Sequence, residues 1–100
     1  MGVRIGNYIF EGPYLSVDDV ADRSGVYAVL RANINGKFDV IDIGESHAVH
    51  KRLKNHDRAF CWLQFCDNAP YYAVYYTEEV TRKQIEHELR IIYNPPCGDR

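Results

Sequence analysis

Residues 25–33 alternate between two sets of side chains, which is the period of a β-strand. One set holds Val26, Ala28 and Leu30, and the other holds Tyr27, Val29 and Arg31. Asn35-Gly36 comes next and predicts a hairpin with a two-residue turn, because both central positions of that turn take positive φ. The segment 38–44 is then the returning strand.

The two-residue turn also determines which residues pair across the hairpin. Counting outward from the turn, Val29 faces Asp42 and Tyr27 faces Gly44. Residues that pair directly share a face of the sheet, so Tyr27 and Asp42 are diagonal neighbours on one face. Gly44 has no side chain, and we expect it to leave space from which a ligand approaches the phenol of Tyr27.

Helical patterns follow the hairpin. Ser46 is a good N-cap for a helix over about 47–56. Arg52 and His56 are four residues apart and lie on the same flank of that helix. The apolar segment 60–66 is either a short helix or a packed loop.

A third strand and a last helix complete the pattern. The segment 71–76 predicts a strand that is entered after Pro70. The last helix is expected over about 77–93, because apolar residues recur at helical spacing and Glu86 stands beside them. These apolar residues are Ile85, Leu89 and Ile92. Pro95-Pro96 ends the helix, since proline cannot continue it.

This order of elements predicts an α+β fold in which a small three-stranded antiparallel sheet is flanked by helices. The domain is expected over residues 25–98, and residues 1–24 are expected to be an N-terminal extension packed on it, with a helical turn capped by Ser16. A chain of 100 residues suits one domain with one core. No apolar run is long enough to span a bilayer, and we see no signal peptide.

The charge pattern gives no global attraction to nucleic acid, because the formal net charge is −2. Two local basic clusters remain. They are Lys51, Arg52, Lys54 and Arg58 in one, and Arg82, Lys83 and Arg90 in the other. From composition alone, the simpler interpretation is that these charges are solvated helix faces.

The three cysteines, Cys61, Cys66 and Cys97, are an odd number and do not indicate a disulfide framework. A reducing cytoplasm is therefore the expected setting. A zinc site built from His56, Cys61 and Cys66 is the alternative, although the spacing fits no common zinc pattern.

Two short motifs stand on the hairpin strands, Gly25-Val26-Tyr27 and Asp42-Ile43-Gly44. Arg52 and His56 follow on one expected helix and Glu86 on another. Taken in that order, most of the chain resembles the GIY-YIG nuclease superfamily, whose members carry a Gly-Ile-Tyr strand, a Tyr-Ile-Gly strand, a helical Arg and a later helical Glu.

The resemblance implies divalent-metal-dependent hydrolysis of phosphodiester bonds in nucleic acid, with DNA as the expected substrate. It implies that Glu86 holds one Mg²⁺ or Mn²⁺ and that Arg52 stabilises negative charge on the phosphate. It further implies that Tyr27 activates the attacking water with the help of His56. The expected substrate-binding positions are Arg52, Lys51 and Gly44.

Two positions depart from the pattern of the family. Asp42 stands where the second Tyr is expected, and Gly98 stands where a closing Asn is expected. A carboxylate beside Tyr27 raises the pKa of the phenol and repels phosphate. We therefore expect Asp42 either to accept the proton as a catalytic residue or to join Glu86 as a second metal ligand.

Two other functions are compatible with the same residues. The first is a catalytically decayed domain that binds nucleic acid or another protein. The second is a subunit that packs against a copy of itself through residues 60–66, which include Trp62 and Phe65, because exposed aromatic residues mark interfaces.

Overall fold

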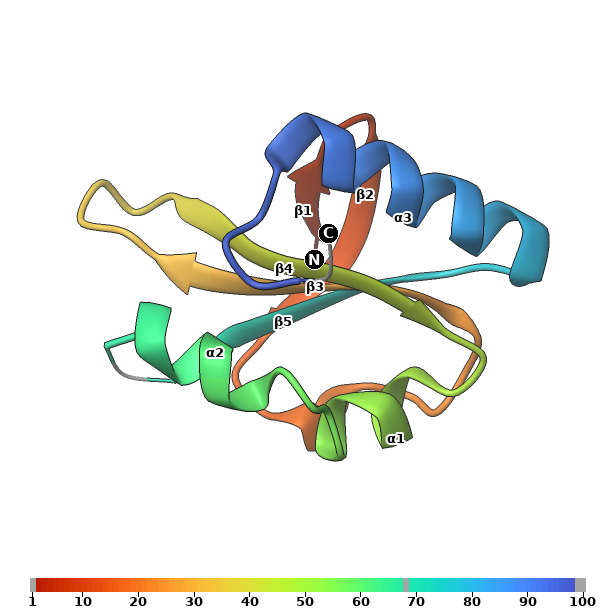
Figure 1. The fold of residues 1–100 in the computed structure, drawn as a ribbon, viewed down its shortest axis with the longest axis horizontal. Coiled ribbons are helices and arrows are strands. Elements are labelled where there is room, and N and C mark those ends of the chain that lie inside the picture. Colours follow the sequence, from red (N-terminus) through yellow and green to blue (C-terminus); the bar gives the residue numbers. More distant parts are fainter. Residues whose placement is uncertain (1, 68, 99–100) are drawn as a thin grey trace.

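The computed structural model describes residues 2–67 and 69–98, and its centre is a curled antiparallel sheet of five strands (Figure 1). The strands are β1 (Gly2–Ile5), β2 (Tyr8–Tyr14), β3 (Gly25–Ala32), β4 (Phe38–Ser46) and β5 (Tyr71–Tyr76). Their order across the sheet is β1-β2-β5-β3-β4, and every neighbouring pair is antiparallel. The α+β class is confirmed, whereas a sheet of three strands is too small.

The two additional strands come from the N-terminal segment, which was expected only to pack on the domain. β1 and β2 form a hairpin, and β2 pairs with β5, so that residues 2–14 extend the central sheet. Gly6 lies in the turn between them at φ 59°, a conformation that suits glycine. The backbone N–H of Gly6 donates to the hydroxyl of Tyr93 at 2.7 Å, and the hydroxyl of Tyr8 donates to Glu88 at 2.8 Å. These bonds hold the hairpin against the last helix.

Helices cover both faces of the sheet (Figure 1). The helix α3 (Glu79–Tyr93) lies on one face, while α1 (Val49–Lys54) and α2 (Ala59–Phe65) lie on the other. A short 3₁₀ helix, η1 (Val17–Asp19), begins with Ser16, whose hydroxyl accepts from the backbone N–H of Asp18 as predicted. Within the described residues, no helix is long and apolar enough to cross a membrane.

The alternation along β3 fills two separate cores, one on each face. The first set of side chains packs with Ile43 and with Ile85 and Leu89 of α3. The second set, which includes Tyr27, packs with residues of α1 and α2. Ile92 was expected on the apolar stripe of α3, but it is 56% exposed and lies outside the core.

The β3–β4 turn differs from the predicted two-residue type. The N–H of Gly36 donates to the carbonyl of Asn33 at 3.1 Å, the N–H of Asn33 donates to Lys37 at 2.8 Å, and Gly36 has φ 76°. The loop therefore has three residues, as in a turn followed by a glycine bulge. This shifts the pairing near the turn by one residue, so that Leu30 pairs with Val40.

A second irregularity restores the predicted pairing near the site. Ile41 is an extra residue on β4, because Leu30 pairs with Val40 whereas Val29 pairs with Asp42. Beyond this bulge Tyr27 pairs with Gly44. The predicted pairs are confirmed, although the turn from which they were counted was wrong.

The helix after the hairpin is shorter than expected. It ends at Lys54, so His56 lies in the connection to α2 and not on the helix that carries Arg52. The hydroxyl of Ser46 accepts from the N–H of Ala48 at 3.0 Å, and the N-cap position itself belongs to Ala48. The last helix is close to its predicted bounds, with Glu78 as N-cap.

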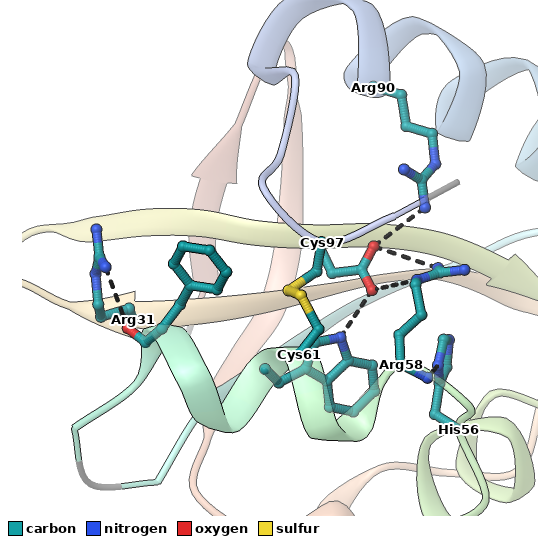
Figure 2. Close-up of a disulfide and its surroundings, with 9 residues drawn as sticks. Arg31, His56, Arg58, Cys61, Arg90 and Cys97 are labelled. Atoms are coloured by element: carbon teal, nitrogen blue, oxygen red, sulfur yellow. Dashed lines mark hydrogen bonds and ion pairs between the residues drawn. A yellow bond between two sulfur atoms is a disulfide. The ribbon is translucent and has the colours of Figure 1, made fainter. Parts of the chain in front are cut away.

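The cysteines overturn the expectation that the chain has no disulfide. Cys61 of α2 is bonded to Cys97 of the C-terminal segment (Figure 2). Cys66 is free and buried. Since Cys61 is oxidised, it is not available as a thiolate ligand for the alternative zinc site. The cytoplasmic setting also loses the argument on which it rested, because disulfides are rare in a reducing compartment.

The apolar segment 60–66 forms most of α2, and only part of it is open to a partner. Trp62 is buried in the core and Phe65 packs against it, whereas Phe60 and Leu63 are exposed. An interface through Trp62 is therefore ruled out by its burial. Self-association through Phe60 and Leu63 stays a prediction.

Candidate functional site

Tyr27 and His56 form a contact beneath the edge strand β4. The hydroxyl oxygen of Tyr27 lies 2.5 Å from Nε2 of His56. Only 1% of Tyr27 is exposed, and the side chain of His56 has no exposed surface. The ring of Tyr27 lies across Gly44, where an added Cβ would be 2.1 Å from the phenol oxygen. The space opposite Tyr27 is thus filled by its own ring.

The contacts of His56 indicate which of its nitrogens carries the proton. The backbone N–H of Arg58 donates to Nδ1 at 3.0 Å. In a neutral imidazole the acceptor nitrogen is unprotonated, so the proton resides on Nε2, which faces Tyr27. Burial, together with the charges of Arg52 and Arg58, lowers the pKa of His56 to about 4. His56 is therefore neutral near pH 7.

Tyr27 also keeps its proton near neutral pH. Burial raises the pKa of its phenol to about 12, against the charge of Arg58, which lowers it. Asp42 raises this pKa by less than Arg58 lowers it, and Arg52 opposes the rise as well. The effect expected of Asp42 is present, but a neighbouring guanidinium outweighs it.

Asp42 is an internal ion-pair residue with no exposed surface. Its Oδ2 accepts from Nε of Arg58 at 2.8 Å and from Nε1 of Trp62 at 2.7 Å. Its Oδ1 accepts from Nη2 of Arg90 at 3.1 Å, so guanidinium groups approach it from two sides (Figure 2). These contacts leave neither oxygen open to a metal ion or a substrate proton. These contacts fit neither role expected of Asp42, which were proton acceptor and second metal ligand.

Arg52 is more accessible than Tyr27, His56 and Asp42. Its side chain is 36% exposed and extends from α1, where Nη2 donates to Asp57 at 2.9 Å. The charge of Arg52 lowers the pKa values of both Tyr27 and His56. Lys51 is more exposed and lies 3.9 Å from Asp22. These two cations provide the charge that the site presents to solvent.

Glu86 reaches the same stretch of β4 from the opposite face of the sheet. Two ion pairs align α3 with β4: Arg82 with Glu45 at 2.6 Å, and Arg90 with Asp42 at 3.1 Å. Glu86 lies midway between the two arginines along α3. Tyr27, His56 and Arg52 therefore lie on the face of the sheet that α1 and α2 cover, whereas Glu86 lies on the helix that covers the other face (Figure 1).

The carboxylate of Glu86 fits a hydrated divalent cation through one oxygen. Its Oε2 accepts from Nε of Arg90 at 2.7 Å, whereas among the described residues no group donates to Oε1. Its side chain is 25% exposed. In the part of the chain that the structure describes, no three His, Cys, Asp or Glu side chains gather as a metal-binding group. Glu86 would thus be the single protein ligand, as is typical of Mg²⁺ that keeps most of its waters.

The basic clusters are less solvated than composition suggested. Arg58, Arg82 and Arg90 all lie in ion pairs with little exposed surface. Their partners Asp42 and Glu45 lie 16 to 48 residues away along the chain, so local sequence does not indicate these pairs. Gly98 lies against one of these arginines, because a Cβ at this position would be 2.1 Å from Nη1 of Arg90.

No family model, no curated protein and no solved structure matches this chain.

Proposed function

We propose that the protein hydrolyses phosphodiester bonds in nucleic acid at the edge of β4, around Gly44. The observation that carries this proposal is the contact of Tyr27 with His56 beneath Gly44, packed against the helix that carries Arg52, while ion pairs of α3 with β4 hold Glu86 on the other face of the sheet. These are the residue types that the resemblance to GIY-YIG nucleases assigns to one site. DNA is the substrate that we infer from the same resemblance.

Each residue has a role that suits its surroundings. Arg52 binds the phosphate and stabilises the charge that grows there, because it is the accessible guanidinium of the group. The resemblance assigns the proton transfer to Tyr27 and His56, which are in contact. Lys51 adds positive charge for a second phosphate.

Glu86 would hold Mg²⁺ or Mn²⁺ through Oε1. The bound ion would neutralise charge on the phosphate and favour an ionised water. Arg90 competes with the cation for the same carboxylate, so we expect the ion to bind weakly in the absence of substrate.

The proposal is tested by cleavage of plasmid and single-stranded DNA with Mg²⁺ or Mn²⁺. Glu86→Gln and Arg52→Gln should each reduce cleavage by about 100-fold or more, which corresponds to about 3 kcal/mol of lost transition-state stabilisation. Glu79→Gln and Lys54→Gln are the matched controls, because these residues lie on the same helices with exposed side chains. Equal cleavage by all four variants, or no cleavage by the wild type, would overturn the proposal.

A second candidate function is a domain that binds nucleic acid without cutting it. The observation in its favour is the burial of the Tyr27–His56 contact together with the Glu86–Arg90 ion pair. In that case DNA binding weakens with rising salt and is reduced by Lys51→Gln and Arg52→Gln. Glu86→Gln leaves the affinity unchanged, and no substrate is cleaved.

A further inference from the structure

A cavity of about 300 Å³ lies between the two edge strands of the sheet, β1 and β4, on the face that α3 covers. Because the sheet curls (Figure 1), Ile5 of β1, Leu30 of β3 and Phe38 of β4 all line it. Tyr93, the last residue of α3, lines it as well. This volume is at the lower end of the range for ligand pockets, so the cavity suits a small molecule.

Much of the lining is apolar and held in place by other contacts. Ile5 and Leu30 are almost fully buried. Phe38 packs edge-on against a tyrosine ring of β5, with ring centroids 5.2 Å apart. The hydroxyl of Tyr93 accepts from the backbone N–H of Gly6 at 2.7 Å. Two aromatic rings and two aliphatic side chains are therefore already arranged to contact an apolar molecule, which lowers the cost of binding it.

Two exposed cations, Arg4 and Lys37, complete this lining, and none of the residues that line the cavity is acidic. The Nε of Arg4 donates to the carbonyl of Gly6 at 3.3 Å, which leaves its terminal nitrogens free among the described residues. The C-terminal end of α3 lies at the same cavity. A helix C-terminus carries only about half a negative charge, so two full positive charges exceed it and the cavity attracts anions.

The absence of partners for these two cations is unusual in this chain. Every other Lys and Arg that the structure describes, except Arg23, lies in an ion pair with Asp or Glu. Arg23 lies over the ring of Tyr76 instead, 4.4 Å from its centroid. Within residues 2–67 and 69–98, the two cations that have neither a carboxylate nor an aromatic partner therefore line the same cavity.

We propose that this cavity binds a small amphipathic anion, that is, a molecule with an apolar body and one carboxylate, sulfonate or phosphate group. The body contacts the rings of Phe38 and Tyr93, and the acidic group lies between Arg4 and Lys37, where both are open to solvent. An inorganic anion makes no use of the apolar lining, and a neutral molecule makes no use of the cations. The proposal is independent of the nuclease function, because Tyr27 packs in the core on the other face of the sheet.

The cavity is tested with anilinonaphthalene sulfonate, a fluorescent probe that has an aromatic body and one sulfonate. Fluorescence titration at low salt should show one saturable site on the wild type. Arg4→Gln/Lys37→Gln should weaken binding by about 3- to 10-fold, because each exposed ion pair contributes up to a few-fold. Arg23→Gln is the matched control and should bind as the wild type does, since Arg23 is an exposed cation outside the cavity.

Other ligands separate the contribution of the charge from that of the apolar body. Phenylnaphthylamine has the rings of the probe without the sulfonate, so its affinity should be equal for the wild type and the double variant. Octanoate should displace the anionic probe, whereas acetate and inorganic phosphate at the same concentration should not. The proposal is overturned by a wild type without saturable binding, by equal affinities of the wild type and the double variant for the anionic probe, by an equal loss in Arg23→Gln, or by displacement with phosphate.

Discussion

Asp42 is a fully buried carboxylate whose charge is compensated by two guanidinium groups and an indole N–H. Removing one partner of such a group leaves an uncompensated charge in the interior, which is why buried ion pairs tolerate substitution poorly. Asp42 therefore acts through Arg58 and Arg90 and has no direct access to a ligand. Its burial also keeps negative charge away from the surface where a phosphate would bind.

His56 makes the free energy of unfolding depend on pH, and substitution of His56 isolates this contribution. The pKa of its imidazole falls from 6.5 to about 4 on folding, because burial disfavours the charged form. The unfolded chain thus binds the proton first, so the stabilisation is complete above about pH 6.5 and is lost as the pH falls toward 4. In urea titrations the wild type should lose on the order of 3 kcal/mol more than His56→Gln across this range.

The matched control is His87→Gln, because His87 is exposed on α3. Its free energy of unfolding should follow that of the wild type at every pH. Parallel curves for the wild type and His56→Gln would instead show that folding leaves the pKa of the imidazole unchanged.

At the scale of elements, the disulfide and the C-terminal segment close the edge of β4. Cys97 is bonded to Cys61 of α2, and its backbone N–H donates to the carbonyl of Ile41 in the β4 bulge at 3.0 Å. Gly98 then packs against the guanidinium of Arg90. The segment therefore fixes the bulge and the ion pairs that flank Asp42.

Loss of the disulfide should destabilise the fold substantially. The bond spans 36 residues, and constraining a loop of that length in the unfolded chain contributes about 3–4 kcal/mol. Cys61→Ser/Cys97→Ser and reduction of the wild type by dithiothreitol should lower the free energy of unfolding by this amount. The double variant should be insensitive to dithiothreitol. A wild type whose stability ignores the reductant would contradict the prediction.

The β3–β4 hairpin shows how much of the structure can be predicted from local sequence. Alternation identified β3 and the turn signal identified β4 as its returning strand, and the pairs Tyr27–Gly44 and Val29–Asp42 are confirmed. The turn type was wrong, because Asn35-Gly36 also suits a three-residue loop in which only Gly36 takes positive φ. The partners of Asp42 were not predictable, since Arg58, Trp62 and Arg90 follow it by 16, 20 and 48 residues. Such contacts depend on the packing of whole elements.

At the scale of the molecule, the N-terminal hairpin completes one of the two cores. Ile5 and Phe10 pack with Ile85 and Leu89 of α3. The hairpin was not predicted because its strands are short and Gly12-Pro13 interrupts the second one, a pattern that disfavours strand assignment. The pairing of β2 with β5 holds these short strands in place, because it makes the hairpin part of the central sheet.

Substitution of two adjacent residues of β2 tests whether the N-terminal hairpin contributes to the stability of the fold. Phe10 has no exposed surface, whereas its neighbour Ile9 is 61% exposed on the other face of the strand. Phe10→Ala should lower the free energy of unfolding by about 3–5 kcal/mol, because it removes a fully buried aromatic ring and leaves a cavity. Ile9→Ala should change it by no more than about 0.5 kcal/mol. Urea denaturation of both variants decides the matter, since a dispensable extension would tolerate the two substitutions equally well.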